Sequence, residues 1–252
     1  MMLLNNEVHV WLADFSSFKK IDSYRALLNG DEFDRLRQDG ESFNKMLPLL
    51  SRALLRKTLS RYRDVPPQQW KFNRGAYGKP EIANFEVPFF FNVSHSAQLA
   101  VCAICEIGPI GVDLERTDRI CSADRIAHRF FAQSEVDRLL ELTDEPRRRR
   151  FFELWTLKEA YLKAKGVGLT QPLNSMSFFL KDDGTIAIQF VTKSDDPACW
   201  AFSLFEPCLH YQLALAVQRP KLLNPLNIRF LSTDAGFMES EGVFKEDVAV
   251  VR

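Results

Sequence analysis

Apolar residues recur every three to four positions between Phe151 and Leu169, a spacing that is typical of an amphipathic helix. Gly166 follows this pattern, and glycine commonly ends a helix because it accepts the left-handed backbone conformation. Trp155, Glu159 and Lys163 are spaced four residues apart, so the helix would place them on one side. Taken alone, the acidic and basic residues are most simply explained as an ion pair worth about 0.2–0.5 kcal/mol.

The rest of the chain also divides into helical and strand-like patterns. Helices are predicted at 31–39, 43–63 and 148–164. Strands are predicted at 8–13, 70–72, 89–93, 99–105, 110–115, 176–180, 185–191, 199–205 and 211–217, with one more at 227–231. The second helix should end at 65–67, where two prolines forbid its continuation.

A helix followed by antiparallel strands occurs twice along the chain, and residues 98–104 look similar to 212–217. This repetition predicts an α+β fold of two similar halves with pseudo-twofold symmetry, and an active site in the cleft between them. The halves would cover residues 1–109 and 110–220. Residues 221–252 form a tail to which we assign no function.

The composition excludes several classes of partner and location. The 33 basic and 33 acidic residues balance, so no global field favours nucleic acid or a membrane surface. Apolar runs are far shorter than the roughly 18 residues of a membrane span, and the N-terminus does not resemble a signal peptide. Five cysteines, an odd number, predict free thiols in a reducing compartment, the cytoplasm. Cys102 and Cys105 would face opposite sides of one strand, which favours a structural role.

Two carboxylates project from the predicted strand at 110–115. Asp113 and Glu115 are two residues apart, so they face the same way. Side by side they repel one another unless a cation joins them, and their oxygens suit magnesium. The residues alone leave a second interpretation equally open, namely two solvated acids at an exposed strand end.

Two short segments are candidate anion sites. Ser94-His95-Ser96 lies where a turn is predicted, so its hydroxyls, its imidazole and nearby backbone amides are available to an anion. Gly78-Lys79-Pro80 offers a cation on a rigid turn. The simpler alternatives are a surface histidine and an ordinary hairpin. A serine hydrolase is disfavoured because the Gly-x-Ser-x-Gly motif is missing.

These motifs together resemble the Sfp-type 4'-phosphopantetheinyl transferases in order and spacing. The likeness covers residues 8–217 and rests on Asn92-Val-Ser-His-Ser96, Gly111-Val-Asp-Leu-Glu115, Phe130-Phe131, Trp155-Thr-Leu-Lys-Glu-Ala-Tyr-Leu-Lys163 and Gly166-Val-Gly-Leu169. It implies a magnesium-dependent transfer of the 4'-phosphopantetheine arm of coenzyme A to a serine of an apo acyl or peptidyl carrier protein. The co-product would be 3',5'-adenosine bisphosphate, and the pathway would be fatty acid, polyketide or nonribosomal peptide synthesis.

The resemblance also implies roles for individual residues. The magnesium ligands would be Asp113, Glu115 and Glu159. The catalytic residues would be Glu159, which takes the proton of the serine hydroxyl, with Lys163 and His95 at the phosphates. Coenzyme A would be bound by Gly78, Lys79, Pro80, Ser94, His95 and Lys163. Lys158 would either join the site or pair with a core acid.

One position departs from the family pattern. The family usually has an arginine near the start of the first long helix, where it contacts the 3'-phosphate of coenzyme A. Aligning Arg52-Ala-Leu-Leu-Arg56 puts Leu47 at that position, so Lys45 or Arg52 would have to compensate.

The carrier protein would dock near Arg119, Arg125, Arg129 and Phe130, because carriers are acidic around the modified serine. Ile120 and Ile126 would add apolar contacts, although a solvated amphipathic helix explains the same pattern. The run at 147–150 is interpreted as a charged helix entrance. A monomer would suffice, since one chain would form the cleft. Two alternatives to the transferase are a magnesium phosphotransferase with a small-molecule acceptor and a non-catalytic module that binds carriers.

Overall fold

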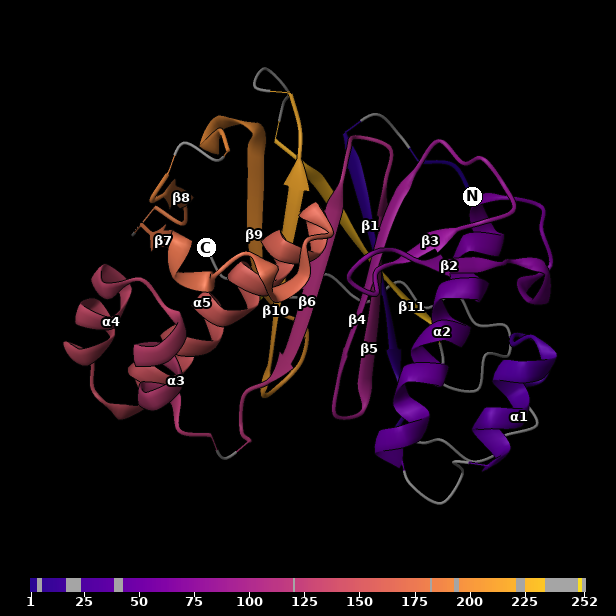
Figure 1. Ribbon diagram of the computed structural model, residues 1–252, viewed down its shortest axis with the longest axis horizontal. Helices are drawn as coiled ribbons and strands as arrows, with labels where there is room; N and C mark the ends of the chain where they lie inside the picture. The colour runs from indigo at the N-terminus through magenta and orange to yellow at the C-terminus, as the bar shows by residue number, and fades with distance from the viewer. Residues whose placement is uncertain are drawn as a thin grey trace. The chain divides into compact units, whose positions relative to one another are not determined.

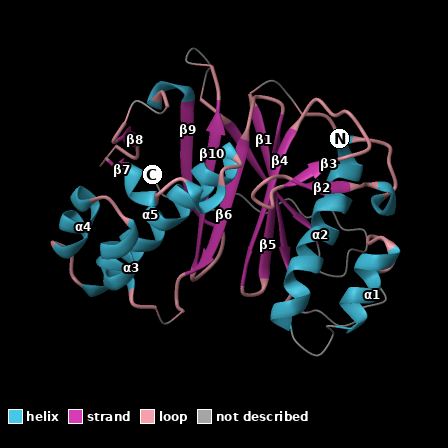
Figure 2. Ribbon diagram, in the orientation of Figure 1, coloured by secondary structure: helices cyan, strands magenta, loops and turns pink. Residues whose placement is uncertain are grey.

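The computed structural model describes residues 1–3, 6–16, 24–38, 43–119, 121–181, 183–192, 195–220, 225–233 and 249–250. The chain separates into two compact units. Unit 1 consists of Met1–Ile107 and Asn224–Asp247, and unit 2 of Gly108–Leu223 and Val248–Arg252. Each unit combines a four-stranded sheet with helices (Figures 1 and 2). The predicted α+β class is therefore confirmed.

The sheet of unit 1 has the strand order β11-β1-β5-β4. Its strands are β1 (Glu7–Asp14), β4 (Phe90–Ser96), β5 (Leu99–Cys105) and β11 (Asn227–Thr233). β5 pairs antiparallel with both β1 and β4, whereas β11 pairs parallel with β1. The strand predicted in the tail is thus confirmed as β11, and it completes the sheet of unit 1.

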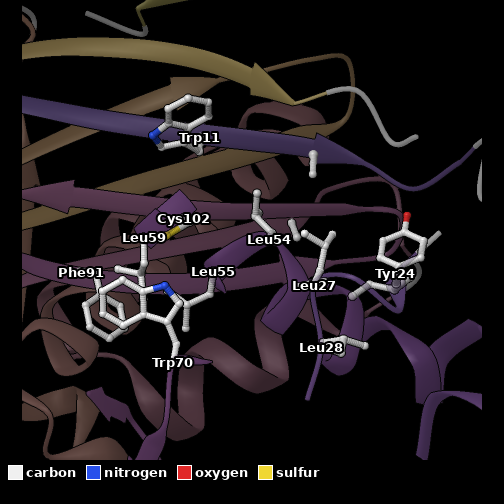
Figure 3. Close-up of a cluster of buried hydrophobic side chains, with 14 of the residues drawn as sticks. Trp11, Tyr24, Leu27, Leu28, Leu54, Leu55, Leu59, Trp70, Phe91 and Cys102 are labelled. Carbon is white, nitrogen blue, oxygen red and sulfur yellow. The ribbon is translucent and has the colours of Figure 1, made fainter. Parts of the chain in front are cut away.

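Helix α2 (Phe43–Tyr62) packs on this sheet through β4 and β5, and α1 (Gly30–Gln38) packs on α2. The core of unit 1 gathers side chains from α2, the sheet and the segment at Trp70, as Figure 3 shows. Cys102 is buried in this core, Cys105 on the same strand is also buried, and neither belongs to a disulfide. A short hairpin of β2 (Phe72–Arg74) and β3 (Pro80–Ile82) completes the unit.

The predicted turn at Ser94-His95-Ser96 is wrong. These residues continue β4 and pair with Val101, Ala100 and Leu99 of β5. Ala97 and Gln98 make the turn instead, and Ala97 adopts a φ of 50°. The backbone groups of Ser94, His95 and Ser96 therefore belong to the ladder between β4 and β5 and not to an open loop. The prediction that free backbone amides of a turn bind an anion here is thus not supported. The strand predicted at 70–72 lies two residues later in the chain, as β2.

The sheet of unit 2 has the order β12-β9-β10-β6, with all neighbours antiparallel. Its strands are β6 (Ile110–Arg116), β9 (Trp200–Glu206), β10 (Tyr211–Gln218) and β12 (Ala249–Val250). A separate hairpin consists of β7 (Met176–Leu180) and β8 (Ile186–Phe190). Three helices follow β6 in the chain, namely α3 (Ala123–Phe130), α4 (Gln133–Leu140) and α5 (Asp144–Lys165). The strand predictions in this unit are confirmed to within two residues.

Helix α5 is the element around which unit 2 is built. It lies against β6 and β10 (Figure 1), and most residues of its second half are buried. Asp144 and Glu145 lie in the first turn, where their negative charges interact favourably with the positive end of the helix dipole. Gly166 follows the last turn with a φ of 68°, as predicted. The helix begins one turn earlier than predicted, so the basic run at 147–150 lies within it.

Gly111 allows β6 and α5 to touch through their backbones. A Cβ atom at this position would lie 1.9 Å from the carbonyl oxygen of Ala160 and 2.4 Å from the amide nitrogen of Ala164. No real Cβ approaches a backbone atom so closely, so only glycine fits here. Gly111, Asp113 and Glu115 alternate along the strand and therefore share the face that α5 covers. The close contact at Gly111 thus sets how near the helix lies to the two acids.

We expect Gly111→Ala to lower the free energy of unfolding by about 3 kcal/mol or more, at the upper end of the cost of overpacking, because backbone atoms must move. Urea unfolding followed by circular dichroism measures this change. Gly30→Ala is the matched control, because no heavy atom lies within 4 Å of its added Cβ, and it should leave stability nearly unchanged. Equal midpoints for the two variants would contradict the proposed close contact.

Candidate active site

Asp113 on β6 and Lys163 on α5 form the centre of the candidate site. The Lys163 Nζ lies 2.6 Å from the Asp113 Oδ1. The aspartate side chain is 7% exposed and that of the lysine 30%. Glu159 lies one helical turn before Lys163 and is half-buried. The structure therefore brings the predicted strand acids and the predicted helix residues onto one strand–helix interface within unit 2.

Glu159 experiences the electrostatics of this interface most strongly. Its pKa is raised from the ordinary value of 4.5 to about 7. Burial is the main cause, the negative charges of Asp113 and Glu115 add to it, and the ammonium of Lys163 opposes it. Without a further cation, the Glu159 carboxyl group therefore keeps its proton to a higher pH than an ordinary glutamate does.

Glu115 has a different counter-ion. Its Oε1 lies 3.2 Å from a guanidinium nitrogen of Arg119, four residues further along the chain. The same guanidinium lies over the ring of Phe152 on α5, 5.6 Å from its centroid. Arg148 of α5 donates through Nε to the Thr117 carbonyl at 2.8 Å. The segment after β6 is thus held against the helix by two arginines.

The acids suit magnesium by their donor chemistry. Among the described residues, no three histidine, cysteine, aspartate or glutamate side chains gather closely enough to form a ready metal cluster. Magnesium does not require one, because it typically takes one or two carboxylates and keeps several waters. Burial and the charges of Asp113 and Glu115 raise the pKa of Glu159, and a divalent cation would stabilise its ionised form. The residues present therefore fit Mg²⁺.

Lys158 does not face this site. Its side chain is fully buried, and its Nζ contacts the Glu135 Oε2 at 2.8 Å. It also donates to the carbonyls of Leu173 at 2.8 Å and Met176 at 2.7 Å. Glu135 in turn accepts from the amide of Phe178. The alternative of a core acid as its partner is confirmed, and the pair connects α4 and β7 to α5.

The other predicted residues belong to unit 1. Ser94 is buried within β4, whereas His95 on the same strand is exposed. Lys79 lies in the turn of the β2–β3 hairpin, where its carbonyl accepts from Gly75 and where Gly78 adopts a φ of 84°. Burial lowers the pKa of Lys79. The joint action of these residues with the acids of unit 2 stays a prediction.

The departure at Leu47 has a structural explanation. Leu47 is buried in the core of unit 1, 5% exposed, where a leucine contributes packing. Arg52, one proposed substitute, pairs with Glu32 at 3.0 Å. The side chain of Lys45, the other, lies outside the described residues.

The predicted carrier surface lies on α3. Arg125 and Arg129 are exposed, and Arg129 stacks over Phe130 at 5.1 Å. Phe130 packs edge-on against Trp155 of α5, with ring centroids 6.3 Å apart. Ile120 lies outside the described residues.

Sequence reasoning missed the contribution of Arg147 and Arg148. Both arginines line a cavity of about 490 Å³ beside α3. The run of four arginines at 147–150 was the signal in the sequence. None of the described helices has the length and apolar content needed to cross a membrane.

Comparison with known proteins bears on both units. The family model described as the 4'-phosphopantetheinyl transferase superfamily matches residues 109–217, and the model 4'-phosphopantetheinyl transferase, N-terminal, matches residues 20–107. The 4'-phosphopantetheinyl transferase HetI of Nostoc sp. is 35% identical over 174 residues, 68% of this chain and 73% of that protein. The 4'-phosphopantetheinyl transferase Sfp of Bacillus subtilis is 34% identical over 172 residues, covering 68% and 74%. A solved Thermotoga maritima holo-[acyl-carrier-protein] synthase is 24% identical with a TM-score of 0.37, covering 45% of this chain and 64% of that chain.

In metal-free protein, Glu159→Gln should raise the free energy of unfolding above pH 7 by up to about 3 kcal/mol. Between pH 4.5 and about 7, Glu159 keeps its proton in the folded state and loses it in the unfolded state. The folded state is therefore destabilised as the pH rises through this window, and glutamine, which does not ionise, removes this destabilisation. The gain should shrink as the pH falls through this window and vanish below it.

Urea unfolding at several pH values in the presence of a chelator tests this expectation. Glu106→Gln, at an exposed position, is the control and should change stability little at any of these pH values. A gain of equal size at pH 4.5 and pH 8 would contradict a perturbed Glu159.

Proposed function

The chain belongs to the 4'-phosphopantetheinyl transferase superfamily, and we propose that it transfers the 4'-phosphopantetheine arm of coenzyme A to a serine of an apo acyl or peptidyl carrier protein, releasing 3',5'-adenosine bisphosphate. The observation that carries this proposal is the β6–α5 interface, where Asp113 pairs with Lys163 beside Glu159, whose pKa is raised mainly by burial. This interface combines acids for a cation, a base and an ammonium for phosphate.

Asp113, Glu115 and Glu159 would hold Mg²⁺. Bound there, the ion neutralises the diphosphate of coenzyme A and stabilises charge on the leaving phosphate. Glu159 accepts the proton of the attacking serine hydroxyl at a carboxylate oxygen, directly or through one water.

Lys163 binds and orients the phosphates. Its ammonium pairs with Asp113 and is partly exposed, so a phosphate beside the acids can also reach it. In unit 1, coenzyme A contacts come from Ser94 and His95 of β4 and from the hairpin turn at Gly78-Lys79-Pro80. With Leu47 in the core, the 3'-phosphate is recognised by fewer cations than the family pattern provides.

The carrier protein docks on the α3 surface. Arg125 and Arg129 meet its acidic residues, with Arg119 nearby, and Phe130 supplies an apolar contact. Charges of opposite sign steer encounter and select the partner. A transferase with a small-molecule acceptor would not need the basic α3 surface, so dependence on this surface distinguishes the two reactions.

Intact-protein mass spectrometry of an apo acyl carrier protein tests the proposal directly. Incubation with this protein, coenzyme A and Mg²⁺ should add the mass of one phosphopantetheine group. The gain should disappear with a chelator or when alanine replaces the acceptor serine. Glu159→Ala should slow it by about 100-fold or more, the usual contribution of a general base. Glu106→Ala is the matched control and should transfer at the normal rate.

Two outcomes would overturn the proposal in different ways. No mass gain with several carriers, although coenzyme A binds, would favour a non-catalytic module that binds carriers. Turnover of coenzyme A that is insensitive to Arg125→Glu with Arg129→Glu, and that modifies no carrier, would favour a small-molecule acceptor.

A further inference from the structure

Arg119 contacts two different features of unit 2. On one side its guanidinium pairs with Glu115, one of the acids assigned to magnesium, at 3.2 Å. On the other side Arg119 lines the cavity of about 490 Å³ beside α3. A single side chain therefore connects the metal acids with a pocket in the proposed carrier surface.

We call this pocket the arginine cavity. It is lined by Arg119, Arg125, Arg147 and Arg148, by Asp124 and Asp144, and by the small residues Cys121, Ser122 and Ala123. Four guanidiniums against two carboxylates leave an excess of positive charge. The first turn of α3 adds the positive end of a helix dipole. The arginine cavity is thus suited to an anionic group, such as a carboxylate.

Two of the four arginines are held by backbone carbonyls. Arg147 donates to Leu142 through Nε at 3.0 Å and through Nη2 at 2.7 Å. Arg148 donates to the carbonyls of Thr117 and Arg119. These contacts keep both guanidiniums at the cavity wall, so a bound anion meets an electrostatic field that is already in place.

Arg119 itself is held weakly. Its side chain is 47% exposed, and that of Glu115 is 17% exposed. Water screens an ion pair whose cation is this exposed, so the pair is weak. A carboxylate that enters the arginine cavity can therefore compete with Glu115 for this guanidinium. The same guanidinium also lies over the ring of Phe152, 5.6 Å from its centroid.

We propose that Arg119 is an exchangeable counter-ion that couples carrier docking to metal binding. An acidic side chain of the carrier enters the arginine cavity and takes Arg119 from Glu115, which leaves the Glu115 carboxylate available to Mg²⁺. This inference rests on the proposed function, because it takes the carrier as the source of the acid. Coupling between two binding sites is reciprocal, so Mg²⁺ also strengthens carrier binding.

Titration of the full chain with Mg²⁺ by isothermal calorimetry tests the coupling without turnover. Coenzyme A is present, and the carrier has alanine in place of its acceptor serine. The carrier should tighten the Mg²⁺ Kd of the wild-type protein by about two- to five-fold, the range open to an exposed ion pair. Arg119→Gln should show the tighter Kd without carrier, and adding carrier should then change it little.

Arg125→Gln is the matched control. Arg125 lines the same cavity and donates to the Ser122 Oγ, so its loss should weaken carrier binding and leave the Mg²⁺ Kd without carrier at the wild-type value. A carrier with amides in place of the acids around its serine should produce no shift.

The coupling is overturned if Arg119→Gln binds Mg²⁺ as the wild type does without carrier, or if the carrier still shifts its Kd. It is also overturned if Mg²⁺ does not bind. The mass-spectrometric assay separates these failures from failure of the transferase itself, since carrier modification by the wild-type protein does not depend on any shift.

Discussion

Direct backbone contact between β6 and α5 at Gly111 determines the geometry of the candidate site. Because alternate strand residues share a face, the glycine that admits the helix also directs Asp113 and Glu115 toward it. Because helix residues four apart share a face, Glu159 and Lys163 meet these acids together. Packing at the buried interface therefore sets the spacing of the charged groups, and their mutual interactions do not.

Such packing carries an electrostatic cost. Three carboxylates are held in one partly buried region, and the pKa of Glu159 is raised by its burial and by the charges of Asp113 and Glu115. Lys163 and Arg119 offset part of it, each pairing with a different acid. Two cationic side chains against three carboxylates leave an excess of negative charge, and this excess favours a divalent cation. The proposed Mg²⁺ site follows from this charge distribution.

Much of this arrangement could be predicted from the sequence, because it depends on local periodicity. The period of two placed Asp113 and Glu115 on one face, and the helical period placed Glu159 beside Lys163. Gly166 marked the helix end correctly. The proximity of β6 to α5 was not accessible, because it depends on contacts far apart in the chain.

Other features were not local and were missed or mistaken. The turn after β4 was placed too early, because Ala97 gives no glycine or asparagine signal for its positive φ. Lys158 and Lys163 lie on the same helix with similar local patterns, and only tertiary packing shows that one is a buried structural residue. The parallel pairing of β11 with β1 joins the ends of the chain and leaves no local trace.

The central claim is that the carboxylates of β6 and α5 bind a divalent cation. The most direct test is an NMR titration of the ¹³C-labelled Glu159 carboxyl group, assigned with Glu159→Gln, without and with Mg²⁺. The account predicts a pKa near 7 in the metal-free protein and a clear decrease when Mg²⁺ is added. A metal-free pKa near the ordinary 4.5, or one that Mg²⁺ leaves unchanged, would contradict it.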